Sequence, residues 1–233
     1  SGNIYLGLHE FNDMGFLLHF LEPNDLFLDI GANVGSYTIL AGIVKKSHVH
    51  SFEPIPSTYS RLKSNILLNG KSNINLHNIG LSNKSSTLNF SFQNNTTNRV
   101  VNNDDKKSIK VVVKKLDDFD ISPTMIKIDV EGFEYFVLEG GKETLKSSKL
   151  KCIIIELNSS GKLYGIDDLE IYNFLISLNF IAYNYDPFSR NLKKLNFSEL
   201  GKHNTLFLRD GYENEIYNRL KSSRFFKINK VKF

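Results

Sequence analysis

Residues Leu26–Leu40, LFLDIGANVGSYTIL, place an acid and a glycine-rich turn between two apolar runs. The first run, which ends at Ile30, has the composition of a short strand, and the second has the pattern of a helix. In an open α/β sheet, ligands bind beyond the carboxyl ends of the strands. Glycines in such a turn allow backbone angles that other residues resist, and they let a ligand approach the main chain closely. This stretch therefore predicts a strand, a ligand-binding turn and a helix.

The spacing within the turn excludes two common nucleotide-binding loops. A phosphate-binding loop ends in Gly-Lys-Ser or Gly-Lys-Thr, whereas Gly35-Ser36 has no lysine. The dinucleotide pattern G-x-G-x-x-G is also missing, and the turn has the spacing D-x-G-x-x-x-G, which starts at Asp29. A carboxylate at the tip of the strand would repel a pyrophosphate. It suits a ligand with cationic character, such as the amino group of S-adenosylmethionine (SAM).

A second acid supports the same kind of ligand. Glu53, in HSFEP, directly follows the predicted strand His48–Phe52 and comes about 20 residues after Gly31. An acid in this place can accept hydrogen bonds from both ribose hydroxyls of a nucleoside. The glycine turn and this acid together favour an adenosyl cofactor that has no pyrophosphate.

The chain has the length and composition of one α/β domain. Its 233 residues are 41% hydrophobic, which is enough for a full core. Short β-rich runs alternate with helical patterns, and this alternation favours a parallel sheet with helices on both faces. The predicted strands are Leu26–Ile30, His48–Phe52, Asn75–Ile79, Met125–Ile128, Cys152–Leu157, Phe180–Tyr185 and Thr205–Leu208. The predicted helices are Ser36–Lys45, one that starts at Pro56, Phe133–Leu145, and one that starts at Asp167 or Asp168 and buries Leu169, Tyr172 and Ile176.

Two terminal segments and one insertion depart from this alternation. Residues 1–24 are rich in Phe and Leu, which predicts a helical lead-in or cap over the sheet edge or the site. Residues 25–210 form the predicted α/β domain. Within it, residues 86–119 contain two β-rich runs around a polar loop at residues 93–108, which predicts a β-hairpin insertion. Residues 211–233 predict a basic C-terminal helix or tail.

Charge and cysteine content favour a cytoplasmic protein. The formal charge is +4, and much of the basic excess lies in the C-terminal tail. We expect this tail to be solvated, and a patch for an anionic partner is the alternative. The single cysteine, Cys152, excludes an internal disulfide and fits a reduced compartment. No apolar run approaches the ~20 residues of a membrane span, and no leader pattern is expected at the start.

Longer pieces of the sequence resemble one enzyme family. The pieces are FLDIGANVGSYTIL, SFEPIPSTYSRLKSNILLN, IGLSN, KLDDF, IKIDVEGFEYFVLEGG, IIIELN and NTLFL. In this order they are similar to the FkbM family of SAM-dependent methyltransferases. The resemblance implies a Rossmann-like class I methyltransferase fold, an α/β fold whose seven-stranded, mostly parallel sheet has an antiparallel last strand. It also implies O-methylation of a hydroxyl on a sugar, a glycan, a nucleotide sugar or a secondary metabolite, with S-adenosylhomocysteine (SAH) as the product.

The resemblance also implies roles for individual residues. The predicted cofactor loop consists of Asp29, Gly31, Asn33 and Gly35. Glu53 is predicted to hold the ribose. The other predicted cofactor contacts are Gly80, Leu81 and Ser82 around the adenine, His9 and Glu10 at the methionine end, and Asp129 at the end that faces the methyl group.

Acids after the fourth and fifth predicted strands indicate the catalytic end of the site. In IKIDVEGFE, Asp129 and Glu131 are two residues apart and point the same way if the segment is extended. Glu134 begins the next helix, where an acid interacts favourably with the dipole. Glu156, in IIIELN, belongs to the neighbouring strand. A sugar hydroxyl is a very weak acid, so we predict that Asp129, Glu131 and Glu156 assist its deprotonation.

A metal ion is an alternative source of this assistance. Asp129, Glu156 and Asn158 offer oxygen ligands from two adjacent strand ends, which suits Mg²⁺ or another hard divalent cation. Such an ion would lower the pKa of the acceptor hydroxyl. The other interpretation is that these side chains accept hydrogen bonds from the backbone or the substrate and that no metal binds.

Three further functions compete with O-methylation of a small molecule or glycan. A nucleic-acid N-methyltransferase usually has an Asn/Asp-Pro-Pro-aromatic motif after the fourth strand, where this chain has DVEGFE. An RNA ribose methyltransferase is harder to exclude, although a charge of +4 without a basic stripe argues against it. The last alternative is a catalytically inactive cofactor-binding partner, against which the glycine turn and the paired acids argue.

Overall fold

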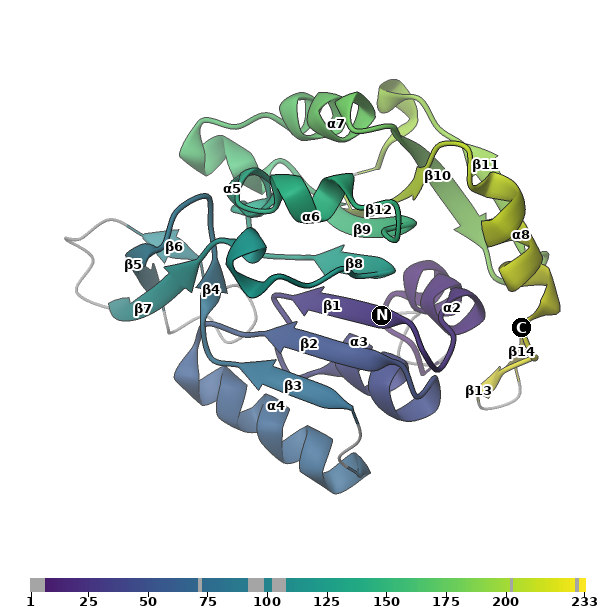
Figure 1. Ribbon diagram of the computed structural model, residues 1–233, viewed down its shortest axis with the longest axis horizontal. Helices are drawn as coiled ribbons and strands as arrows, with labels where there is room; N and C mark the ends of the chain where they lie inside the picture. Colours follow the sequence, from purple (N-terminus) through teal and green to yellow (C-terminus); the bar gives the residue numbers. More distant parts are fainter. Residues whose placement is uncertain (1–6, 71–72, 92–98, 102–107, 202, 229–230) are drawn as a thin grey trace.

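The computed structural model describes residues 7–70, 73–91, 99–101, 108–201, 203–228 and 231–233. A central sheet of eight strands has helices on both faces, and a smaller sheet stands beyond one end of it (Figure 1). The strand order of the central sheet is β11-β10-β12-β9-β8-β1-β2-β3. The predicted α/β class with a mostly parallel sheet is therefore confirmed.

The central sheet contains the seven predicted strands and one more. Five neighbouring strands are parallel: β3 (Ile74–His77), β2 (His48–Phe52), β1 (Leu26–Ile30), β8 (Met125–Ile128) and β9 (Cys152–Leu157). The last predicted strand, β12 (His203–Arg209), is antiparallel to β9 and to β10 (Phe180–Asp186). An additional edge strand, β11 (Asn191–Lys194), pairs with β10 in antiparallel orientation.

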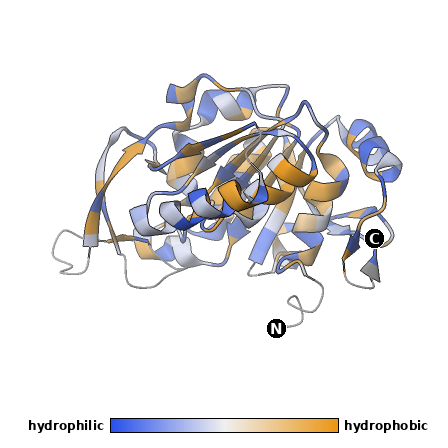
Figure 2. Ribbon diagram, turned by 90° about the horizontal axis from the view of Figure 1, so that it is seen from below, coloured by the Kyte–Doolittle hydropathy of each residue, from blue (hydrophilic) through white to orange (hydrophobic). Residues whose placement is uncertain are grey.

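Alternation along the strands divides the core into two apolar layers. In β1, Phe27 packs into one layer, and Leu28 and Ile30 pack into the other. Asp29 and its register partner Lys127 are buried polar residues on the same side as Phe27. Figure 2 shows that hydrophobic residues are concentrated in the central strands and in the parts of the helices that face them.

Helices cover both faces of the sheet. One apolar layer includes residues of α2 (Phe11–Phe20), α3 (Ser36–Ile39), the π-helix η1 (Leu40–Val44), α4 (Pro56–Asn69) and α8 (Glu213–Ser222). The other includes residues of α5 (Glu134–Glu139), α6 (Lys142–Lys146), α7 (Asp168–Ser177) and the short helix η2 (Leu116–Phe119). Two further short helices are η3 (Ser160–Tyr164) and η4 (Phe197–Glu199). Of the helices in the described ranges, none is both long and apolar enough to cross a bilayer.

The predicted helix Phe133–Leu145 is two helices rather than one. α5 ends at Glu139 and α6 begins at Lys142, with Gly140 between them. A Cβ atom added at Gly140 would overlap the carbonyl oxygen of Ser82, so the break lies where this segment touches the strand after β3. The break therefore comes from tertiary packing, and only glycine fits there.

A small sheet with the order β4-β7-β5-β6 forms the insertion. β5 (Ser86–Ser91) and β7 (Ser108–Lys114) are an antiparallel pair, β6 (Val100–Val101) pairs with β5, and β4 (Gly80–Leu81) pairs with β7. Most of the polar loop predicted at residues 93–108 lies outside the described residues. Figure 1 shows this sheet beyond the end at which β1, β2 and β3 terminate.

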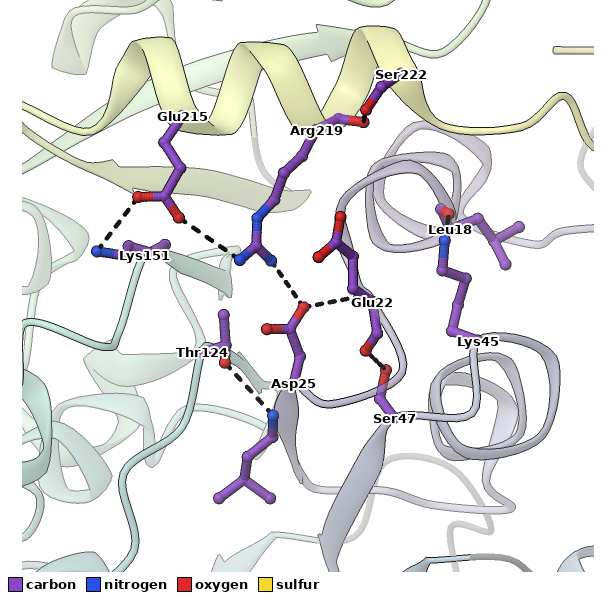
Figure 3. Close-up of polar contacts among 11 residues, drawn as sticks. Leu18, Glu22, Asp25, Lys45, Ser47, Thr124, Lys151, Glu215, Arg219 and Ser222 are labelled. Atoms are coloured by element: carbon purple, nitrogen blue, oxygen red, sulfur yellow. Dashed lines mark hydrogen bonds and ion pairs between the residues drawn. The ribbon is translucent and has the colours of Figure 1, made fainter.

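The segment after β12 is attached to the start of β1. Arg219 of α8 donates to Asp25 at 2.8 Å, and Glu215 of the same helix pairs with Lys151 at 3.7 Å (Figure 3). β13 (Lys227–Ile228) and β14 (Val231–Lys232) follow as a small antiparallel pair. The last residue, Phe233, is buried. The segment is therefore anchored to the domain through Ile216, Leu220 and Phe233, while the basic side chains of Lys221, Arg224, Lys227 and Lys232 are exposed.

Candidate functional site

The turn after β1 has the backbone conformation that its glycines allow. Gly31, Asn33 and Gly35 have φ values of 82°, 50° and 94°, in the left-handed region. A Cβ atom added at Gly31 would overlap the carbonyl oxygen of Asp129, so the turn passes directly over the end of β8. The N–H group of Gly31 also donates to the carbonyl of Phe52 at 3.0 Å. The turn is therefore fixed against the ends of both neighbouring strands.

Glu53, directly after β2, is buried with only 5% of its surface exposed. Its two carboxylate oxygens accept hydrogen bonds from the backbone N–H groups of Asn33, at 3.0 Å, and Ile55, at 2.9 Å. Burial raises the pKa of Glu53 to about 7, although these hydrogen bonds favour the ionised form. The carboxylate is therefore held in one orientation by the turn that it faces.

A first cavity lies between the ends of β1, β2 and β4. Glu53 lines it on one side, together with Gly31 and Asn33 of the turn. Its other lining residues include two acids, Asp129 and Glu131, and a set of apolar side chains: Ile55, Ile79, Leu81, Phe90, Val130 and Phe133. A carboxylate at the rim of an apolar slot suits a ligand with a flat apolar ring and a pair of hydroxyl groups.

A second cavity adjoins the first, and its lining includes a lysine as well as carboxyl groups. The two cavities share four lining residues, which are Gly31, Asn33, Asp129 and Glu131. The second cavity is also lined by His9, Glu10, Asp29, Tyr37, Lys127 and Glu156. The turn after β1 and the end of β8 therefore line both cavities.

Lys127 is a site residue that the sequence analysis did not identify. Only 3% of its surface is exposed, and its Nζ donates to Asp129 Oδ2 at 2.7 Å. The ammonium group lies 4.7 Å from the ring centroid of Tyr37. Burial lowers the pKa of Lys127, but the carboxylates of Asp129 and Asp29 outweigh this effect and the net pKa is raised. A lysine inside the otherwise apolar strand MIKI is the pattern that could have indicated it.

Three carboxyl groups of the second cavity, those of Asp29, Glu131 and Glu156, have raised pKa values. Burial, and then the nearby Asp129 and Glu131, raise the pKa of Glu156 to about 8. Its Oε2 is buried without a hydrogen-bond partner among the described residues. Burial, followed by Asp129, also raises the pKa of Glu131. A cationic ligand would stabilise the ionised form of these carboxyl groups.

Two more acids near this cavity belong to α2: Glu10 is its N-cap residue, and Asp13 lies in its first turn. Tyr37 donates from its hydroxyl to Glu10 Oε2 at 2.5 Å, so the predicted methionine-end residue Glu10 lies against α3. Asp13, which the sequence analysis did not identify, accepts a hydrogen bond from Asn204 at 3.4 Å. Burial, and then Glu10, raise the pKa of Asp13 to about 7. α2 therefore adds acids to the side of the sheet on which Asp29 lies.

The segment from Asp129 to Glu131 differs from the extended one predicted, whereas Glu134 begins α5 as predicted. Glu131 has a φ of 56°, so the segment after Asp129 is not extended. Asp129 and Glu131 nevertheless both line the two cavities. Glu134 is buried, and its Oε1 accepts from the N–H groups of Val130 at 3.0 Å and Gly132 at 3.2 Å. Glu134 therefore fixes the loop that presents Glu131, in addition to its place at a helix N-terminus.

Several predicted site residues lie outside both cavities. Gly35 shapes the turn, and a Cβ atom added there would meet Leu62 at 2.5 Å. Ser82 is buried and its hydroxyl donates to Asn83. Asn158 accepts a hydrogen bond from Ser160 at 2.9 Å through its Oδ1.

The metal site stays a prediction. Of its three proposed ligands, Asp129 is paired with Lys127 and Asn158 is bonded to Ser160. Within the part of the chain that the structure describes, no group of three or more His, Cys, Asp or Glu side chains is arranged to hold a metal ion.

Comparison with known proteins identifies the fold and the family. The fold is that of a class I SAM-dependent methyltransferase. A methyltransferase of Streptococcus mutans, solved in complex with SAH, matches with a TM-score of 0.50 and 12% identity over 84% of this chain and 94% of that chain. This match concerns the fold alone. The FkbM methyltransferase domain model matches residues 29–185, and the chain belongs to that family.

Two curated relatives have sequence similarity to the chain. Hexuronic acid methyltransferase AglP of Haloferax volcanii is 28% identical over 165 residues, which is 68% of this chain and 64% of that protein. Methyltransferase 1 of Beauveria bassiana is 29% identical over 147 residues, which is 51% of this chain and 59% of that protein. The matches therefore cover less than two thirds of either relative.

The residues of the first cavity fit SAM. A side chain at Gly31 is excluded by the main chain of Asp129, which keeps the turn open to close approach by a ligand. Glu53 faces the same space with a carboxylate that can accept from ribose hydroxyls. The acids of the adjoining cavity suit the cationic sulfur and amino group of SAM.

Proposed function

We propose that this chain is a SAM-dependent O-methyltransferase that methylates a hydroxyl group of a sugar, a glycan, a nucleotide sugar or a secondary metabolite. The observation that supports this most is the position of Asp129. It lines both cavities and forms an ion pair with the buried Lys127. A carboxylate that lines both cavities is close to the cofactor on one side and to an entering acceptor on the other.

The chain contributes binding, orientation and proton removal. SAM, when bound, supplies an electrophilic methyl group for in-line transfer. Glu53 accepts hydrogen bonds from the ribose, and Ile55 and Leu81 pack against the adenine. Asp129 accepts the proton of the acceptor hydroxyl as the oxygen attacks the methyl group. Lys127 holds Asp129 in place during this step.

A sugar is the favoured acceptor for two reasons. The relative AglP is a hexuronic acid methyltransferase by its name, which supports an acceptor of the sugar class. Glu131 and Glu156 also line the second cavity, and carboxyl groups are common partners of sugar hydroxyls. We assign these two side chains to orienting the acceptor and assisting Asp129.

The test is a turnover assay with a defined panel of acceptors. SAH formation from SAM is measured with free hexuronates, neutral hexoses, nucleotide sugars and ribosomal RNA, each with Mg²⁺ and with a chelator. A methylated sugar oxygen, identified by nuclear magnetic resonance of the product, supports the proposal. Methylation of RNA ribose alone replaces it with the nucleic-acid function, and SAM binding without turnover on any acceptor replaces it with the inactive-partner function.

Asp129→Asn tests the assigned base. We expect kcat to fall by about 100-fold or more, because general-base assistance is worth this much, while the Kd for SAM stays within about twofold. Glu143→Gln is the matched control, since Glu143 is an exposed acid of α6 paired only with Lys146 among the described residues. A full-rate Asp129 variant would refute the role.

A further inference from the structure

The small sheet is attached to the segment that borders the first cavity. β4, which contains Gly80 and Leu81, pairs in parallel with β7, and Gly80 is opposite Val113. The N–H group of Ser82 continues this pairing with a hydrogen bond to the carbonyl of Lys114 at 2.9 Å. The predicted adenine-binding segment is therefore an edge strand of the insertion, although the insertion follows it in the chain.

Phe90 of β5 connects the core of the small sheet to this cavity. Only 7% of its surface is exposed, and it packs with Ile55, Val111 and Val113. It also lines the first cavity. A Cβ atom added at Gly80 would lie 3.4 Å from the tip of the Phe90 ring, so the ring packs close to the main chain of the segment that borders the cavity.

We propose that Phe90 is a cofactor-binding residue whose ring contacts the adenine of SAM, and that the small sheet is thereby a wall of the cofactor site. The apolar part of the cavity is lined by Ile55, Leu81, Phe90, Val130 and Phe133, among others. A flat heteroaromatic ring in such a slot gains most from an aromatic wall, because every base has a π-face to offer. The inference rests on the proposed use of SAM and is independent of the acceptor.

Phe90 is expected to contact only the adenine part of a bound ligand. The carboxylate of Glu53 and the acids of the second cavity line other parts of the site. A residue that contacts only the adenine affects every ligand that has an adenine, whatever the charge on sulfur and whether or not the amino-acid part is present. SAM, SAH and 5′-methylthioadenosine, which lacks the amino-acid part, therefore form a discriminating set of probes.

The experiment is titration calorimetry of the full chain and its variants with these three probes. Phe90→Ala is expected to weaken the binding of all three by a similar factor, about 5- to 100-fold, as for the loss of one base–aromatic contact. Phe90→Leu, which keeps most of the volume, should lie between Phe90→Ala and the wild type. Val112→Ala is the matched control, because Val112 is on β7 of the same sheet and is 51% exposed.

Each outcome supports or overturns a distinct claim. Unchanged affinities in both Phe90 variants, within about twofold, would overturn the inference and leave the SAM-dependent function standing. A loss for SAM and SAH that spares 5′-methylthioadenosine would place Phe90 at the amino-acid end and overturn the adenine contact. If the wild type binds none of the probes, the proposed function fails and the inference fails with it. Thermal unfolding without ligand shows whether Phe90→Ala is folded, and Phe90→Leu decides the question if it is not.

Discussion

At the scale of single residues, burial and hydrogen bonding have opposite effects on the pKa of Glu53. Burial raises the pKa of its carboxyl group to about 7, although the N–H groups of Asn33 and Ile55 donate to it. Ribose hydroxyls would add further donors, which favour the ionised form. Cofactor binding is therefore expected to lower the pKa of Glu53 and to release a proton near neutral pH.

The affinity for SAM is accordingly expected to weaken as pH falls from about 8 to about 6, by up to about tenfold per pH unit below the pKa. Titration calorimetry in buffers of different ionisation enthalpy measures both the affinity and the proton released. Glu53→Gln cannot ionise, so it should bind more weakly at the higher pH and lose the proton release that Glu53 contributes. Equal proton release in wild type and variant would remove Glu53 from the ribose role.

Lys127 and Asp129 are expected to stabilise the fold as a coupled pair. Lys127→Met leaves Asp129 without its cation in a partly buried place, which is expected to cost about 3 kcal/mol of unfolding free energy. Asp129→Asn should cost much less in the Lys127→Met background than alone, because the attraction is already lost. Urea unfolding of both single variants and the double variant gives the coupling energy. Additive effects would contradict a direct interaction.

At the scale of elements, strands were predicted more accurately than helix faces. β1, β2, β8 and β9 have the predicted bounds, because short β-rich runs in a parallel sheet are buried on both faces. The N-cap of α7 is Asp167, one of the two residues predicted for the start of this helix. Its side chain accepts a hydrogen bond from the N–H group of Leu169 at 3.1 Å. The predicted buried face of α7 was wrong for Leu169 and Ile176, which are exposed, whereas Tyr172 packs against the core beside the buried Ile171 and Leu175. Spacing cannot choose between two apolar stripes on one helix.

The break between α5 and α6 predicts a difference between two glycine variants. Gly140→Ala would push its Cβ against the carbonyl of Ser82, so we expect a loss of about 1–3 kcal/mol of stability. The displaced strand borders the first cavity, so SAM should also bind more weakly. Gly70→Ala is the control: its φ of 91° makes it strained, at about 1 kcal/mol, but nothing surrounds it. Urea unfolding and calorimetry measure both effects. Equal SAM affinity in the two variants would contradict the coupling.

At the scale of the whole molecule, the fold gathers acids from distant segments on one side of the sheet. α2 contributes Asp13, the end of β9 contributes Glu156, and the loop after β8 contributes Glu131. Asn204 of β12 is opposite Glu156 in register and donates to Asp13. The protein thereby retains carboxyl groups that stay protonated at a pH where the unfolded chain has lost those protons.

Thermal stability of the free protein is therefore expected to fall as pH rises from about 4.5 to about 8. Burial raises the pKa values of Asp13, Glu53 and Glu134 to about 7 and that of Glu156 to about 8. The folded state binds more protons than the unfolded state in this range, so stability decreases as pH rises. Calorimetric unfolding at constant ionic strength measures the trend.

Two histidines oppose the carboxyl groups in the lower part of that pH range and reduce the slope there. Burial lowers the pKa values of His19 and His77 to about 4, so these side chains destabilise the fold only when pH falls below about 6.5, where the unfolded chain binds protons. Above about pH 6.5, the carboxyl groups alone determine whether stability rises or falls with pH. Glu156→Gln should flatten the fall between about pH 7 and about pH 8, and an unchanged slope would contradict the raised pKa of Glu156.

The sequence by itself determined the features that depend on neighbours in the chain. The conformation of the turn at Gly31 and Asn33, the positions of the main strands, and the acid directly after β2 all follow from local composition and spacing. The family resemblance added the class of fold and the cofactor. These inferences succeed because backbone sterics and the alternation of side chains are local properties.

Only the tertiary structure decided which side chains meet in the site. The burial of Lys127 beside Asp129, the place of Asp13 near the second cavity and the contribution of Phe90 to the first depend on segments far apart in the chain. The raised pKa values likewise result from burial and from charges on other strands. No local pattern contains these distances, because they are set by how the sheet, its helices and the small sheet pack together.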